Sequence, residues 1–148
     1  MKSLHLATEE DVDRLLPLVG SFHTEMGLAT DRDQRAEGIA PLLAGSPHGA
    51  VWLIGPRRAP VGYIVLTFGW SVALGGLDAV VDEIFIRPAV RGRGMGHEAL
   101  SEITKAMKQA GVRTLRLEVD RDNEKVRRFY DRAKFELRDS HVIMSLVL

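Results

Sequence analysis

The stretch Arg91-Gly92-Arg93-Gly94-Met95-Gly96 follows an apolar, strand-like segment and opens a helix-like one. Its glycines carry no Cβ, so a ligand can lie directly against the backbone there. The amides of such a loop converge at a helix N-terminus, where unpaired N–H groups and the helix dipole favour an anion. The arginines add positively charged donors. The stretch therefore predicts a binding site for a phosphate or pyrophosphate group.

The glycine spacing does not fit two common phosphate-binding loops. The dinucleotide fingerprint requires a third glycine where this chain has His97, and a P-loop ends in Gly-Lys-Ser/Thr, which does not occur here. The residues fit the pattern Arg/Gln-x-x-Gly-x-Gly, with Arg91, Gly94 and Gly96 at its fixed positions. Taken alone, the loop has an alternative interpretation as a strand-to-helix turn without a ligand. The surrounding elements have to decide between the two.

Length and composition set further bounds. The 148 residues, 45% of them hydrophobic and 27% charged, suit a single domain spanning 1–148. The absence of cysteine excludes thiol-covalent catalysis, and the spacing of the histidines predicts no metal site. Twenty basic and twenty acidic residues cancel, which argues against non-specific nucleic-acid binding. With no apolar signal-peptide core or membrane-length apolar run, we expect a cytoplasmic protein without a membrane partner.

The hydrophobic periodicity predicts a mixed α/β fold. Strand-like runs occur at 4–6, 50–54, 61–68, 79–86, 112–119, 135–137 and 142–147, with a loop expected at 69–78. Helical spacing indicates one helix after Thr8, which Pro17 should kink or end early. Further helices are expected at 31–43, from the glycine loop to about 110, and at 123–133. Gly111 should cap the second of these. This order predicts a central mixed sheet of six to seven strands flanked by about four helices.

Two more segments, together with the glycine loop, resemble a known family. The strand Asp82-Glu83-Ile84-Phe85-Ile86-Arg87-Pro88 precedes the loop, and the run from Leu117 to Asn123 leads into Arg128-Phe129-Tyr130, ahead of Lys134-Phe135. In this order they resemble the GCN5-related N-acetyltransferase (GNAT) family, most clearly over residues 79–137. The chain departs from the family pattern at Lys134, where a glycine is usual, and at Val126, where a small residue is common.

The resemblance implies an enzyme, an acetyl-CoA-dependent acyltransferase that moves an acetyl group directly to a primary amine. In such a site the loop would hold the pyrophosphate, and pantetheine would pair like a strand with the backbone before the loop. That pairing needs a free strand edge, so this strand and residues 112–119 should separate near Ile86. The implied cofactor-binding residues are Ile84, Phe85, Ile86, Arg91, Gly92, Arg93, Gly94, Met95, Gly96 and Asn123.

Three residues are candidates for proton transfer. Tyr130 matches the family tyrosine that protonates the departing thiolate, and its alternative role is packing beside Phe129. Asp82 and Glu83 are candidate bases, which an uninterrupted strand sends to opposite faces. The family's acid, where present on this strand, lies on the same face as Asp82, so Asp82 is preferred. A bulge before Ile86 would reverse that choice. For either acid, the alternative is a structural hydrogen bond or binding of a cationic substrate.

The acceptor stays open at this point. Family position suggests Glu25, within the segment 23–26, and Trp70 as substrate-binding residues. Acidic residues before the loop and in the early helices favour a cationic small-molecule amine that is polyamine-like or aminoglycoside-like. A protein lysine or N-terminal amine is the alternative acceptor, and a non-catalytic acyl-CoA-binding sensor is the rival from another class. A homodimer through the apolar segment Val142–Leu148 is a further expectation.

Overall fold

The computed structural model of the protein describes residues 3–148. Two compact units divide the chain: the first ends at Leu117, and the second is Glu118–Leu148. The prediction that residues 1–148 act as one domain stays a prediction.

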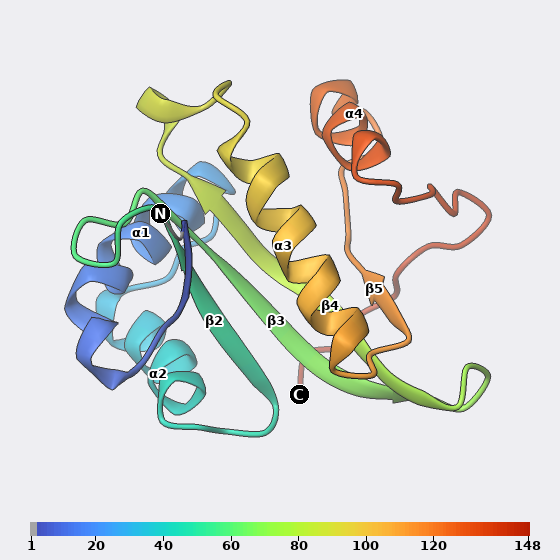
Figure 1. The fold of residues 1–148 in the computed structure, drawn as a ribbon, viewed down its shortest axis with the longest axis horizontal. Coiled ribbons are helices and arrows are strands. Elements are labelled where there is room, and N and C mark those ends of the chain that lie inside the picture. Colours follow the sequence, from blue (N-terminus) through green and yellow to red (C-terminus); the bar gives the residue numbers. More distant parts are fainter. Residues whose placement is uncertain (1–2) are drawn as a thin grey trace. The chain divides into compact units, whose positions relative to one another are not determined.

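The first unit is built on one mixed sheet of five strands. These are β1 (Leu4–Leu6), β2 (Gly49–Ile54), β3 (Gly62–Ser71), β4 (Gly76–Ile86) and β5 (Thr114–Arg116), and they lie in the order β1-β2-β3-β4-β5. The first four pair antiparallel, and β5 runs parallel to β4. The predicted mixed α/β class is confirmed (Figure 1).

The predicted count of six to seven strands is wrong. Residues 112–119 contribute only the three residues of β5, and neither 135–137 nor 142–147 forms a strand. The apolar side chains of the last segment are exposed. A period-two pattern shows that a segment can present one apolar face, but a strand forms only where a neighbour pairs with its backbone, and the pattern names no neighbour.

The predicted loop at 69–78 is also wrong, because β3 and β4 continue through it as a hairpin. Trp70 pairs with Leu77, and only residues 72–75 turn. Gly69, within this segment, serves close packing between the two strands. A Cβ on Gly69 would lie 2.7 Å from the carboxylate Oδ1 of Asp78, which is buried. A glycine inside a strand can mark such a close approach as well as a chain break.

Three helices belong to the first unit: α1 (Val12–Glu25), α2 (Arg32–Leu43) and α3 (Met95–Gln109). Helix α1 follows a single 3-10 turn, Glu9–Asp11, and runs on past Pro17 to Glu25, so the early end does not occur. The positive φ of Gly111 follows the end of α3, as predicted. None of the helices in residues 3–148 is long and apolar enough to cross a membrane.

The helices lie on both faces of the sheet (Figure 1). Helices α1 and α2 bury Leu15, Val19 and Ile39 against Tyr63 and Phe85 in one hydrophobic cluster. Alternate residues of β3 point the other way, and α3 covers that face with its own buried stripe. This arrangement places the C-terminal turn of α1 beside β3 and β4.

The second unit contains one helix, α4 (Glu124–Arg132). Asn123 begins it by accepting a hydrogen bond from the backbone N–H of Val126 at 3.2 Å. Lys134 follows it with φ +72°, the left-handed conformation that glycine usually supplies. The backbone N–H of Phe135 then donates to the carbonyl of Tyr130 at 3.1 Å. The lysine therefore ends this helix in the conformation of the family's glycine.

Candidate active site

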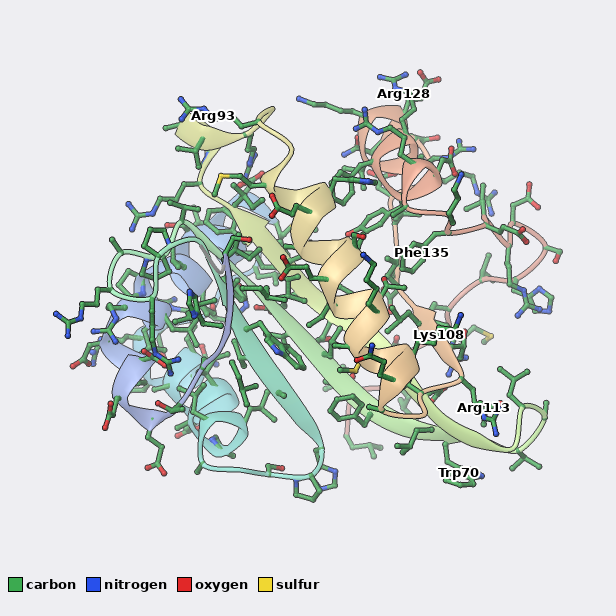
Figure 2. All side chains as sticks on the ribbon, viewed as in Figure 1. Trp70, Arg93, Lys108, Arg113, Arg128 and Phe135 are labelled. Carbon is green, nitrogen blue, oxygen red and sulfur yellow. The ribbon has the colours of Figure 1, made fainter. Side chains whose placement is uncertain are left out.

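The glycine loop has open space beside its backbone. Gly92 and Gly94 have φ values of +80° and +79°, and a Cβ on either would meet no atom within 4 Å. These glycines are therefore required by the backbone conformation, and free space adjoins them. Gly94 is also the N-cap of α3, a helix of 15 residues. Arg93 extends from the loop at one end of the first unit (Figure 2).

The strand edge before the loop is free on one side. On its β5 side β4 pairs only at Asp78, Ala79 and Val80. Within residues 3–148 no strand pairs with that side of β4 from Val81 to Ile86. A strand-like pantetheine requires such an edge at Ile84–Ile86.

A β-bulge decides how the two acids of β4 are placed. Val65 lies opposite Glu83 and Leu66 opposite Val81, so Asp82 is the extra residue. The bulge changes the parity of the strand, and Glu83 shares the α1 face with Phe85. Asp82 is exposed. The premise of an uninterrupted strand, on which Asp82 was preferred, is therefore wrong.

Glu83 is held at both carboxylate oxygens. Its Oε2 lies 2.6 Å from Nε2 of His23 on α1, and its Oε1 accepts from the hydroxyl of Tyr63 at 2.7 Å. The side chains of His23 and Glu83 are 12% and 16% exposed. Burial, and then the charge of Glu83, raise the pKa of Tyr63 far above its ordinary value, so this phenol stays a donor.

Sequence analysis did not assign a role to Tyr63. Its position in an apolar run indicates a core strand, and its hydroxyl finds Glu83 only through the pairing of β3 with β4. His23 was named only as part of a segment near the acceptor. Neither residue has a local signal that predicts its partner, because His23 and Glu83 are separated by 60 positions in the chain.

Arg91 and Glu25, two predicted site residues, are brought together. Two nitrogens of the guanidinium lie 2.9 and 2.6 Å from the two carboxylate oxygens. The Arg91 Nε donates to the carbonyl of Ile86 at 2.7 Å, and the guanidinium carbon lies 5.5 Å from the ring centroid of Phe85. The C-terminal turn of α1 is thereby tied to the start of the glycine loop.

Trp70 lies away from this group. It is 66% exposed and lies on β3 near the hairpin that joins β3 to β4. Arg93 lies at the other end of the first unit (Figure 2). Five strand positions separate it from Val65, the partner of Glu83, which is roughly 17 Å along a strand. The structure does not bring Trp70 near the other predicted residues of this unit.

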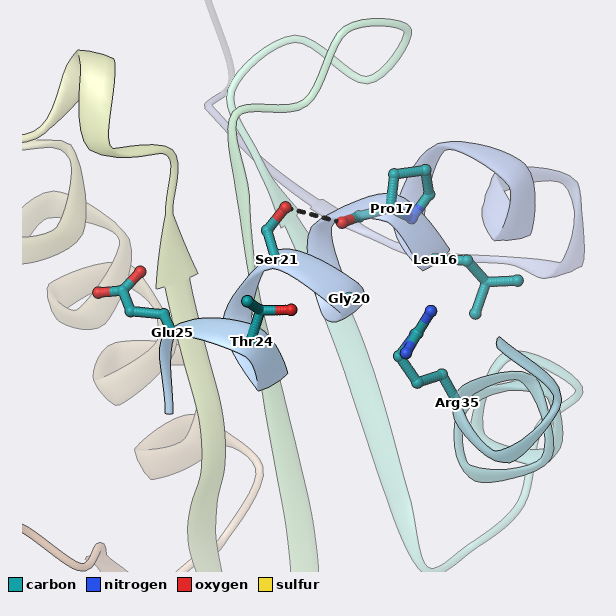
Figure 3. Close-up of a pocket in the computed structure, with 7 residues that line it drawn as sticks. All are labelled: Leu16, Pro17, Gly20, Ser21, Thr24, Glu25 and Arg35. Carbon is teal, nitrogen blue, oxygen red and sulfur yellow. Dashed lines mark hydrogen bonds between the residues drawn. The ribbon is translucent and has the colours of Figure 1, made fainter. Parts of the chain in front are cut away.

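A cavity of about 540 Å³ opens between α1 and α2 (Figure 3). The Arg35 side chain reaches across it toward α1, where a Cβ on Gly20 would lie 3.3 Å from the Arg35 Nε. Of the predicted site residues only Glu25 lines it. The lining residues are Leu16, Pro17, Gly20, Ser21, Thr24, Glu25 and Arg35.

The second unit carries the other two predicted residues. Tyr130 is 9% exposed, with its ring centroid 5.0 Å from that of Phe129 and 5.6 Å from that of Phe135. Burial raises the pKa of Tyr130 to about 12. The side chain of Asn123 is used to cap α4. Across residues 3–148, no three His, Asp or Glu side chains gather into a group that could hold a metal ion.

Comparison with known proteins identifies the family. Residues 12–135 match the acetyltransferase (GNAT) family. The chain therefore belongs to the GNAT family, and the resemblance inferred from its motifs is confirmed.

Individual relatives agree with this. An integron cassette protein from the mobile metagenome of the Cole Harbour salt marsh is 34% identical, with a TM-score of 0.86 over 99% of this chain and 90% of its own. A putative acetyltransferase of Arthrobacter sp. FB24 is 31% identical, with a TM-score of 0.79 over 92% of this chain and 86% of its own. An uncharacterized N-acetyltransferase of Methanocaldococcus jannaschii is 32% identical over 52% of this chain, and the match spans 34% of that relative's length.

Proposed function

We propose that this protein transfers an acetyl group from acetyl-CoA directly to the primary amine of a cationic small molecule. The observation that carries the proposal is the placement of the Glu83 carboxylate. His23 and Tyr63 each contact one of its oxygens, and Glu83 lies on β4, the strand that leads into the glycine loop. The first unit therefore combines a base with a place for an anion. Membership in the GNAT family supports acetyl-CoA as the donor.

The glycine loop and the free edge of β4 would each bind one part of the proposed cofactor. The amides of Gly92–Gly96, together with Arg91 and Arg93, would hold the pyrophosphate at the start of α3. The backbone of Ile84–Ile86 would pair with the two amides of pantetheine, because that side of β4 carries no other strand among residues 3–148.

In the proposed reaction, Glu83 accepts a proton from the acceptor's ammonium group, directly or through water. The neutral nitrogen attacks the thioester carbonyl carbon, and the carbon–sulfur bond breaks. The thiolate takes a proton from a general acid, and the second proton of the nitrogen restores that acid through solvent. The sum is an amide, a thiol and one released proton.

Tyr130 is the proposed general acid, a role that rests on its motif. Its raised pKa keeps the phenol protonated at neutral pH. The same shift moves its pKa away from that of a thiol, which lowers the driving force for proton transfer. The ring also packs against Phe129 and Phe135, as the alternative structural role requires. The two roles differ in what loss of the hydroxyl does to turnover.

A cationic acceptor is supported by the charges on β4. Asp82 and Glu83 are adjacent carboxylates, one exposed and one partly exposed, and no cation pairs with Asp82 within residues 3–148. Such a pair attracts an amine that carries a positive charge before deprotonation. A lysine side chain or a protein N-terminus has the same charge, so proteins are the alternative acceptors and peptides have to be assayed beside the small amines.

The experiment is a turnover assay with acetyl-CoA against polyamines, aminoglycosides and lysine-containing or free N-terminal peptides. We expect the small amines to be acetylated and Glu83→Gln to lower kcat by the roughly 10²–10⁴-fold of a lost general base. Asp82→Asn, the matched change on the next residue, removes a charge that attracts the amine but leaves the base, so it should raise the KM for the amine and leave kcat close to the wild type. Preference for peptides would move the acceptor to proteins. Cofactor binding without turnover of any amine would support the sensor.

We also propose a homodimer in the cytoplasm, joined through the exposed apolar segment Val142–Leu148. The side chains of Val142, Ile143 and Val147 are exposed within it, and contiguous exposed apolar surface commonly marks an interface. Substitution of Ile143 and Val147 by lysine should then convert the dimer to a monomer in sedimentation. A wild-type monomer at the same concentration would contradict the proposal.

A further inference from the structure

A chain of hydrogen bonds crosses the first unit from α2 to β3. The Arg35 guanidinium donates to the carbonyl of Thr30, and its NH1 lies 3.5 Å from the Thr30 hydroxyl. The Thr30 Oγ1 lies 2.7 Å from Nδ1 of His23, whose Nε2 lies 2.6 Å from Oε2 of Glu83. The hydroxyl of Tyr63 completes the chain at Oε1 of Glu83, at 2.7 Å.

The chemistry of the end groups fixes the direction of each bond. An ionised carboxylate can only accept, so Nε2 of His23 carries the proton that points at Glu83. In the neutral imidazole Nδ1 is then an acceptor, and the Thr30 hydroxyl, whose oxygen lies near the Arg35 guanidinium, donates to it. The tyrosine hydroxyl donates to the other carboxylate oxygen. All the donors therefore point toward Glu83.

Aromatic rings pack beside the middle of this chain of hydrogen bonds. The ring of Phe22 lies 6.1 Å from that of His23, and its centroid is 6.0 Å from that of Phe85. These aromatic rings exclude water from one side of the pair and strengthen its hydrogen bonds. The other charged groups nearby are already occupied or exposed, because Glu25 pairs with Arg91 and Asp82 faces solvent.

We propose that His23 is a positioning residue for Glu83, with Thr30 supporting the imidazole tautomer that donates to the carboxylate. The inference rests on the proposed role of Glu83 as base. With Oε2 held by His23 and Oε1 by Tyr63, the carboxylate cannot rotate, and its remaining lone pairs keep one direction toward the acceptor amine. In this role His23 acts through Glu83 and needs no contact with the acceptor or with acetyl-CoA.

The kinetic test uses two substitutions of His23 in the full-length chain. The amide of His23→Gln can still donate to Glu83 from a position close to Nε2, whereas His23→Leu cannot donate. We expect His23→Leu to lower kcat roughly 10–100-fold, the loss typical of residues that orient a functional side chain by a hydrogen bond. The KM for acetyl-CoA should change little. His23→Gln should recover most of the loss. His48→Leu, at an exposed histidine, is the matched control.

A double-mutant cycle with Glu83→Gln separates positioning from structural support. If His23 acts through Glu83, adding His23→Leu to Glu83→Gln should cost almost nothing further. The inference would be overturned if the two losses in kcat multiplied in the double variant, or if His23→Leu and His23→Gln lost equal activity. Either result would leave Glu83 as the base. Wild-type activity in Glu83→Gln would instead remove the proposed base itself.

A measurement without turnover tests the tautomer. Nitrogen-15 NMR of the imidazole should show the ring proton of His23 on Nε2 at neutral pH. Thr30→Val removes the hydroxyl that donates to Nδ1, and it should lower the population of that tautomer and kcat together. A proton on Nδ1 in the wild type, or a tautomer that Thr30→Val does not change, would overturn the proposed direction of the chain.

Discussion

The guanidinium of Arg91 donates to both carboxylate oxygens of Glu25, at 2.9 and 2.6 Å, and its Nε donates to the carbonyl of Ile86. The residue predicted to hold a pyrophosphate is thus already bound by the residue predicted to contact the acceptor. An arginine cannot direct the same N–H groups at a carboxylate and a phosphate at once. If Arg91 holds the pyrophosphate as proposed, Glu25 and the cofactor compete for those N–H groups.

The first prediction follows from this competition. Glu25→Gln should tighten acetyl-CoA binding by up to about fivefold, because an exposed ion pair contributes roughly 0.2–1 kcal/mol. Titration calorimetry measures the change, and the gain should shrink as salt rises. Glu37→Gln, an exposed change of equal charge on α2, is the control. Equal affinities in the two variants would show that Glu25 does not restrain Arg91.

The second prediction concerns the glycine loop. Gly94 has φ +79° with open space beside it, so a side chain there fits but strains the backbone. Asn tolerates this conformation better than most residues and matches Asp in size. Gly94→Asp should therefore weaken acetyl-CoA binding at least about tenfold more than Gly94→Asn, through its charge alone. Equal affinities of the two folded variants would place the pyrophosphate elsewhere.

The third prediction concerns stability at the end of α4. Lys134 has φ +72°, a conformation that costs a residue with a Cβ roughly 1 kcal/mol or more. Lys134→Gly should therefore raise the free energy of unfolding by up to about 1 kcal/mol, the gain being reduced by the entropy of glycine in the unfolded chain. Lys134→Val should lower it, since β-branched residues avoid this conformation. Urea unfolding distinguishes the order, and a valine variant as stable as the glycine variant would contradict it.

The parts of the site that the sequence predicts are those in which the residue type itself sets the local backbone. Gly94 is an example, because a positive φ beside an open surface calls for glycine and starts α3 at the predicted place. Lys134 shows the opposite case, in which tertiary context imposes the conformation on another residue.

The sequence could not decide between Asp82 and Glu83 as the proposed base, because their placement depends on pairing between strands. The bulge at Asp82 exists only in the register of β4 against β3, and Glu83 meets His23 only through the packing of α1 beside the sheet. Trp70 was suggested by family position, and only the pairing of β3 with β4 shows that it lies toward the β3–β4 hairpin. Periodicity measures one segment at a time and carries no information on register.

The last prediction separates the two roles of Tyr130 and uses its titration. Because burial raises its pKa from 10.0 to about 12, the folded state holds the phenolic proton more tightly than the unfolded state does. The resulting stabilisation is complete below about pH 10 and is lost as the pH rises to about 12, and it amounts to roughly 2–3 kcal/mol. Tyr63 contributes in the same direction and is unchanged in the variant.

Tyr130→Phe keeps the ring and removes the proton, so its stability should fall less between pH 8 and pH 11 than that of the wild type. Urea unfolding at the two pH values measures this. At pH 8, turnover should drop by the roughly 10²–10⁴-fold of a lost general acid, while acetyl-CoA affinity and Tm change little. Wild-type turnover would leave water as the acid. A large fall in Tm at pH 8 would instead show that the hydroxyl is a structural group, because the aromatic contacts with Phe129 and Phe135 persist in the variant.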